Sequence, residues 1–186
     1  MSGDAATRQK RSRWALWLPL GLFAAFLLLV FYGLVRPANR DIESAMVGKP
    51  LPEFALPQAV PEREGLSKAD FATGEPSLLN IFASWCIPCA IEAPQLEQLR
   101  QEGVTVNGIA IRDRTEDLNG FLERNGNPFE RIGADNVSAV QLGIGSSGVP
   151  ETFVIDGQGV IRYQHIGMVR DADLPLIRSK LMEAGQ

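Results

Sequence analysis

A run of 22 residues without a formal charge, from Trp14 to Val35, divides this chain into two unequal parts. As a helix with a rise of about 1.5 Å per residue, the run would be roughly 33 Å long, enough to cross the hydrocarbon core of a membrane. Aromatic rings that prefer the level of the lipid headgroups stand near its ends (Trp14, Trp17 and Tyr32). The run therefore predicts one transmembrane helix, which a water-soluble core cannot include.

Basic residues on both sides of this run predict its orientation. Four precede it and two follow it closely, so the positive-inside rule places the N-terminus in the cytoplasm. We expect residues 1–13 to be cytoplasmic, 14–35 to span a bacterial inner membrane, 36–46 to be a linker and 47–186 to form a periplasmic domain. A cleaved signal peptide is the alternative. The run is longer than the apolar part of such a peptide, and no small-x-small cleavage site follows it.

The composition excludes several classes of protein. The formal net charge is −4, and after residue 40 the chain carries twelve basic and twenty-one acidic side chains, so it lacks the basic surface that nucleic acids require. Two cysteines and one histidine are too few for a four-ligand zinc site, and we expect no metal. The length beyond the apolar run suits a single domain.

The two cysteines, Cys86 and Cys89, lie where the sequence changes from strand to helix character. The segment from Ser77 to Ala83 is apolar and of strand length, and the residues after Cys89 keep helical spacing (Ile91, Leu96 and Leu99). Thiol chemistry favours the start of a helix, because free backbone N–H groups and the helix dipole stabilise a thiolate. We predict a redox-active disulfide and no other cofactor, with Cys86 exposed and Cys89 more buried.

Three other interpretations compete for this cysteine pair. A haem-attachment motif would continue with histidine, but Ala90 follows Cys89. A zinc half-site would need a second pair of ligands, which the composition does not provide. A purely structural disulfide stays open, although a loop this short gains little from closure.

In these motifs the chain resembles the thioredoxin superfamily and, within it, the CcmG (DsbE) thiol:disulfide interchange proteins of cytochrome c maturation. The segment from Val47 to Leu56 is similar to the opening of that family, and Leu79 to Cys89 is similar to its active-site strand and loop. The most specific match is Gly148 to Asp156, which contains Val-Pro-Glu. The resemblance covers Val47 to about Glu183 and implies an α/β, thioredoxin-like fold with a mixed central sheet covered by helices.

The resemblance also implies roles around the cysteines. The proline that matches Pro150 is cis in relatives and faces the active site, so we expect a cis Val149–Pro150 bond beside Cys86. Trp85, Val149 and Glu151 would contact the substrate. In this arrangement Cys86 attacks and Cys89 resolves the mixed disulfide.

The chain departs from the family pattern at two places. Thioredoxin carries a buried aspartate where this chain has Asn80, which cannot take up a proton from Cys89. Glu92, three residues after Cys89, matches an acidic residue that relatives of this branch use, so we expect it to handle that proton. The segment from Gly143 to Gly148 does not match the usual lead-in to Pro150.

Hydrophobic patterns predict the rest of the domain. Strands are expected at Val104 to Ile111 and at Val160 to His165, and helices at Thr115 to Glu123 and at Asp171 to Met182. Asp156 to Gly159 has the composition of a hairpin turn. We expect Arg112 to Arg114 to be a solvated loop and His165 to be structural.

The sequence thus predicts a membrane-anchored thiol:disulfide oxidoreductase that reduces protein disulfides. The resemblance implies that its partner is apocytochrome c or a thiol protein of cytochrome c maturation, and that a membrane thiol reductant regenerates it. One alternative is a thioredoxin-like reductant or copper chaperone for cytochrome oxidase assembly. Another is a non-catalytic apocytochrome-binding module. The cysteine spacing alone defines only dithiol exchange, because the reduction potential sets its direction.

Overall fold

The computed structural model describes residues 14–35 and 45–186, and the chain forms two units, Met1–Ile42 and Glu43–Gln186. In the first unit, helix α1 spans Trp14–Val35, and its described side chains, those of residues 17–33, are all exposed. Within the described ranges, no helix is both long enough and apolar enough to cross a membrane. The expected cytoplasmic segment 1–13 and most of the expected linker 36–46 lie outside the described residues.

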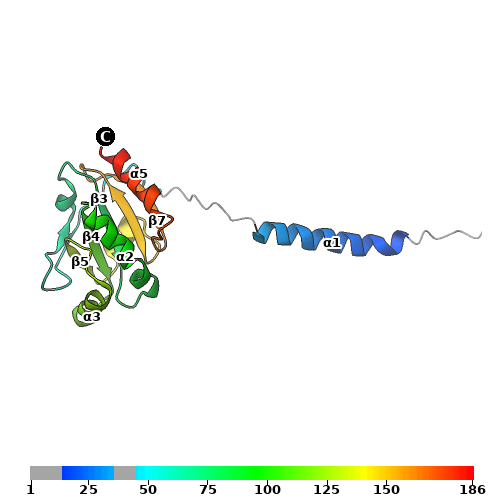
Figure 1. The fold of residues 1–186 in the computed structure, drawn as a ribbon, viewed down its shortest axis with the longest axis horizontal. Helices are drawn as coiled ribbons and strands as arrows, with labels where there is room; N and C mark the ends of the chain where they lie inside the picture. Colours follow the sequence, from blue (N-terminus) through cyan, green and yellow to red (C-terminus); the bar gives the residue numbers. More distant parts are fainter. Residues whose placement is uncertain (1–13, 36–44) are drawn as a thin grey trace, which may run out of the picture. The chain divides into compact units, whose positions relative to one another are not determined.

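The second unit is built around a mixed five-stranded sheet with the order β5-β4-β3-β6-β7 (Figure 1). The middle strand, β3, pairs in parallel with β4 and antiparallel with β6, and every residue of it is buried. This arrangement confirms the thioredoxin-like α/β class. The strands are β3 (Ser77–Phe82), β4 (Val106–Ile111), β5 (Ile132–Asp135), β6 (Glu151–Ile155) and β7 (Ile161–Ile166).

Three helices cover one face of the sheet: α2 (Ile87–Gln101), α3 (Thr115–Asn125) and α5 (Leu174–Ala184). Alternate residues of β3 point to this face, where Asn80 contacts Glu92 of α2 and the ring of Phe82 lies 6.0 Å from that of Phe121 in α3. Right-handed crossovers between parallel strands place α2 and α3 on the same side. An ion pair joins α5 to the end of α2. The active-site helix is therefore held between the sheet and its neighbours.

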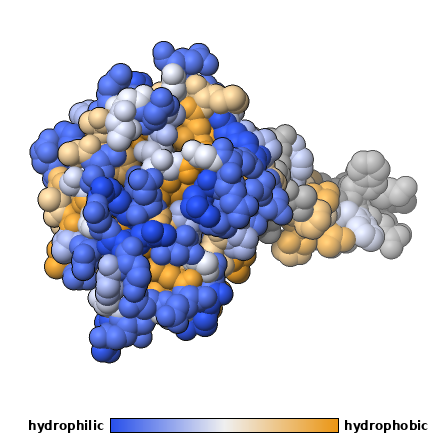
Figure 2. Space-filling model, turned by 60° about the vertical axis from the view of Figure 1, so that its left-hand side comes forward, coloured by the Kyte–Doolittle hydropathy of each residue, from blue (hydrophilic) through white to orange (hydrophobic). Residues whose placement is uncertain are grey.

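A short hairpin of β1 (Ala55–Leu56) and β2 (Leu66–Ser67) lies against the opposite face, followed by the 3₁₀ helix η1 (Lys68–Phe71). Gly133 in β5 permits the close approach of this hairpin, because a Cβ atom at Gly133 would be 2.8 Å from Leu56 Cβ and 3.1 Å from Leu66 Cβ. The outer surface seen in Figure 2 is largely hydrophilic, with smaller apolar areas. The apolar side chains of the domain lie mainly between the sheet and the two layers that cover it, the three helices on one face and the hairpin on the other.

The predicted strands and helices are present, with some shifted bounds. The strand expected from Val104 begins at Val106, and the last helix begins at Leu174 rather than at Asp171. The sequence did not predict β1, β2, β5 or α4 (Ala139–Gly143). Each of these elements has five residues or fewer, so a hydrophobic period cannot be recognised, and β5 contains glycine and alanine, which disfavour strands.

Candidate active site

Cys86 and Cys89 are joined by a disulfide bond at the start of α2. Cys86 is the N-cap of the helix, and its Sγ accepts a hydrogen bond from the backbone N–H of Cys89 at 3.2 Å. A thiolate at Cys86 would have the same N–H donor and would lie at the positive end of the helix dipole. The geometry therefore suits Cys86 as the attacking sulfur.

The expectation that Cys86 is exposed is wrong for this disulfide-bonded state. Its residue exposure is 5%, close to the 3% of Cys89, and both cysteines belong to the hydrophobic core cluster. Its neighbours Trp85 and Ile87, by contrast, are 58% and 76% exposed. A partner protein would thus meet these two side chains first.

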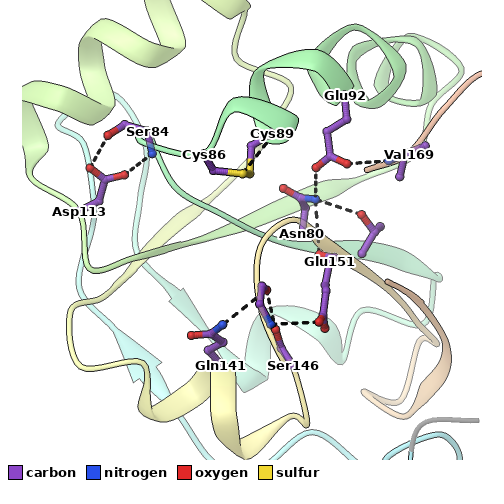
Figure 3. The surroundings of a disulfide bond; sticks show 12 residues. Asn80, Ser84, Cys86, Cys89, Glu92, Asp113, Gln141, Ser146, Glu151 and Val169 are labelled. Carbon is purple, nitrogen blue, oxygen red and sulfur yellow. Dashed lines mark hydrogen bonds between the residues drawn. A yellow bond between two sulfur atoms is a disulfide. The ribbon is translucent and has the colours of Figure 1, made fainter. Parts of the chain in front are cut away.

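The loop after β4 supports the residues that precede the disulfide. The carboxylate of Asp113 accepts hydrogen bonds from the backbone N–H of Ser84 and, at 2.7 Å, from its hydroxyl (Figure 3). The indole N–H of Trp85 donates to the carbonyl oxygen of Arg112 at 3.4 Å. From the sequence this segment was expected to be a solvated strand-end loop of the kind that flanks active sites, but Asp113 was given no role. An acid at the carboxyl end of a strand next to the active-site strand was the signal that could have identified Asp113.

Asp113→Ala should loosen the active-site loop. We expect a loss of about 1–2 kcal/mol in the free energy of unfolding, because both hydrogen bonds to Ser84 have a charged acceptor. Reduction of the disulfide by dithiothreitol should also change in rate. Asp117→Ala is the matched control, since this acid lies in the same open cavity of about 420 Å³ but is exposed on α3. Denaturant unfolding should separate the two variants, and equal stabilities would contradict the supporting role of Asp113.

Glu92 lies on the buried face of α2, about one turn after Cys89, and is 1% exposed. Its carboxylate accepts hydrogen bonds from Asn80 Nδ2 at 2.9 Å and from the backbone N–H of Val169 at 2.8 Å (Figure 3). Burial raises the pKa of Glu92 to about 7, although both hydrogen bonds act to lower it. The structure thus joins Glu92 to Asn80, the residue at which the chain departs from thioredoxin, and it provides a carboxyl group that can exchange protons near neutral pH.

The loop before β6 has the expected backbone geometry, because the Val149–Pro150 peptide bond is cis. Pro150 is buried, and Val149 packs against the cluster that contains both cysteines. Of the residues expected to contact substrate, Trp85 is exposed and Val149 is partly buried. Their roles in binding stay predictions.

Glu151, also expected to contact substrate, is placed differently. It is 1% exposed, and its carboxylate accepts hydrogen bonds from the hydroxyl of Ser147 at 2.6 Å and from the side chain of Gln164 at 2.7 Å. Backbone N–H groups of Ser147 and Gly148 donate to it as well. In this structure its oxygens are turned into the loop and hold it together, and the expected contact with substrate stays a prediction. The Gly143 to Gly148 segment, which does not match the usual lead-in to Pro150, supplies the donors of Ser147 and Gly148, and β7 supplies Gln164.

Comparisons with known proteins agree with this geometry. The redoxin family model matches residues 46–179. The thiol:disulfide interchange protein DsbE of Pasteurella multocida is 38% identical over 177 residues, which cover 90% of this chain and 97% of that protein. DsbE of Escherichia coli K12 is 38% identical over 160 residues, covering 83% and 86%. The chain is a member of the DsbE family.

A solved DsbE structure supports the same assignment. The crystal structure of a DsbE protein from Chlorobium tepidum superimposes with a TM-score of 0.65 and 28% identity, covering 75% of this chain and 98% of that chain. Like its DsbE relatives, this chain is therefore a thiol:disulfide oxidoreductase, and Cys86 and Cys89 are the only cysteines that its sequence offers for this chemistry.

Proposed function

We propose that this DsbE protein is anchored in the bacterial inner membrane and reduces protein disulfides of cytochrome c biogenesis in the periplasm. The observation that carries the proposal is the Cys86–Cys89 disulfide at a helix N-terminus within a DsbE-type domain. The substrate follows from the resemblance of Gly148 to Asp156 to the CcmG branch, whose members keep the cysteine pair of apocytochrome c reduced for haem attachment.

The reaction proceeds by two thiol–disulfide exchanges. The Cys86 thiolate attacks one sulfur of the substrate disulfide, which releases the other substrate sulfur as a thiolate. Cys89 then loses its proton, which Glu92 is placed to handle, and attacks Cys86 Sγ. This step releases the second substrate sulfur and leaves the Cys86–Cys89 disulfide. A membrane thiol reductant would return two electrons to this bond.

The proposed anchor rests on the sequence. The uncharged run from Trp14 to Val35 has basic residues on both sides, and its helix exposes apolar side chains throughout its described part. Such a helix has no polar face to present to water. The expected linker of eleven residues, 36–46, would as a flexible chain reach only about 5–6 Å times the square root of its length. The active site would therefore stay near the bilayer and meet membrane-held partners at a raised effective concentration.

A version of the chain that begins at Ala45 and carries a cleavable export signal tests both parts of this proposal. In cells that lack the native gene, we expect it to restore c-type cytochromes poorly at native abundance and well when a foreign membrane anchor is added. Its dithiol exchange in solution should equal that of the full chain. Haem staining of c-type cytochromes is the measurement.

The outcomes separate the two parts of the proposal. Full restoration by the untethered form would reduce the N-terminal helix to an export signal. If no form changes cytochrome c levels, the substrate is a different protein, and the exchange chemistry of the cysteine pair stands unaffected.

A further inference from the structure

In the side-chain amide of Asn80, only the nitrogen has hydrogen-bond partners, and the oxygen has none among the described residues. Asn80 is 0% exposed, and its Nδ2 lies 2.9 Å from Glu92 Oε1, 3.0 Å from Thr152 Oγ1 and 3.5 Å from the carbonyl oxygen of Glu151. Its Oδ1 is buried and has no hydrogen-bond partner among the residues that the structure describes. A buried carbonyl group without a donor is uncommon in folded proteins and costs stability.

The orientation of this amide is set by its neighbours. Turning it over would place Oδ1 3.5 Å from the carbonyl oxygen of Glu151, which can only accept, and beside the Glu92 carboxyl, which is an acceptor when ionised. Oδ1 therefore points away from Glu92, and Figure 3 shows it on the side of the disulfide. Cys89 and Glu92 are both buried and three residues apart on α2, so they share the helix face that covers Asn80.

Reduction of the disulfide creates the donor that this oxygen lacks. Two thiols of a reductant give two electrons to the S–S bond and become a disulfide themselves. Of the two protons released, one ends on Cys89 Sγ and the other on Cys86 or in solvent. We propose that Asn80 Oδ1 accepts a hydrogen bond from the Cys89 thiol in the reduced protein. This inference rests on the exchange chemistry of the cysteine pair.

In the reduced protein, one sulfur then faces a hydrogen-bond donor and the other faces an acceptor. Cys86 Sγ faces a donor, the backbone N–H of Cys89, which favours a thiolate. Cys89 Sγ faces an acceptor, which favours the neutral thiol. Asn80 is thus a positioning residue that keeps Cys89 protonated until the mixed disulfide forms. Through its nitrogen it also holds Glu92, the group placed to receive that proton.

The infrared S–H band of Cys89 tests the hydrogen bond directly. The chain has only two cysteines, so full-length Cys86→Ser contains a single thiol. We expect its S–H band at a lower frequency when folded than when unfolded in denaturant, as a hydrogen-bonded thiol requires. Asn80→Leu in this background should raise the frequency of the folded band, because the buried thiol then lacks its acceptor. Thr152→Val, which removes an acceptor of the same amide nitrogen, should leave it unchanged.

Two results in this experiment would overturn the proposal. One is an S–H band of Cys89 that has the same frequency in folded and in unfolded Cys86→Ser. The other is a lowered band that Asn80→Leu does not move.

The redox equilibrium with glutathione separates a direct effect from one that acts through Glu92. With both cysteines present, Asn80→Leu should shift the equilibrium about threefold to tenfold toward the disulfide, where tenfold corresponds to about 30 mV. The same shift should persist in a Glu92→Gln background. A shift that disappears there would mean that Asn80 acts only through Glu92. Neither measurement uses a cellular substrate, so failure here leaves the cytochrome c proposal untouched, and the reverse also holds.

Discussion

Cys89→Ala should convert this protein from a catalyst into a trap for its own substrates. Cys86 retains the helix N-terminus and the N–H of residue 89, so it still attacks a substrate disulfide. Without the second sulfur, the mixed disulfide cannot be resolved, and covalent complexes accumulate. Non-reducing electrophoresis after incubation with a disulfide-containing protein should show them, and dithiothreitol should release them.

Cys86→Ala is the matched variant and should form no such complexes. Its remaining cysteine, Cys89, is 3% exposed in the parent structure and lies in the first turn of α2. Both variants should lose all turnover, so a difference in trapping reports on roles rather than on folding. Trapping by Cys86→Ala alone would reverse the assignment of attacking and resolving cysteines.

Glu92→Gln should remove a large pH dependence of stability. Burial raises the folded-state pKa of Glu92 from 4.5 to about 7, so the folded protein binds this proton more tightly than the unfolded chain does. The stability that this gives is fully present below about pH 4.5 and is lost as pH rises to about 7. At about 1.4 kcal/mol per pKa unit, the parent should lose on the order of 3 kcal/mol over this range through Glu92 alone. Glutamine carries no proton to lose, so the variant should lack this contribution.

Denaturant unfolding between about pH 5 and 8 measures the effect, and Glu97→Gln serves as a control. Glu97 is on the same helix but pairs at the surface with Arg100, and such pairs contribute little to stability. The rate of exchange with a protein disulfide should also lose its pH dependence near 7 in Glu92→Gln. If the free energy of unfolding depends on pH in the same way in the parent and in Glu92→Gln, the Glu92 carboxyl is the source neither of the pH-dependent stability nor of the proton exchange.

The sequence predicted those parts of the site that depend on neighbouring residues. The spacing of Cys86 and Cys89 and the change from strand to helix indicated the disulfide at the helix start. The Val-Pro-Glu match indicated the cis bond at Pro150 through a resemblance. In each case the relevant residues lie within a few positions of one another, so a local pattern was sufficient.

Contacts between distant segments could not be predicted in the same way. The support of Ser84 by Asp113 joins residues 29 positions apart, and it depends on which strand lies beside β3. The inward direction of Glu151 depends on donors from the loop before Pro150, where the sequence does not match the usual family lead-in. Cys86 was expected at the surface because free nucleophiles are exposed, whereas the bonded sulfur packs into the core.

The central position of β3 has a consequence for how the protein moves. Local opening in folded proteins starts at poorly covered segments and reaches the most enclosed strands last. In this sheet β5 and β7 are the edges, while β3 is paired on both sides and leads directly into the disulfide. Fluctuations that fray the edges therefore leave the active-site loop attached to its most protected strand. The redox centre can keep its shape through motions that would open a site at the margin of the domain.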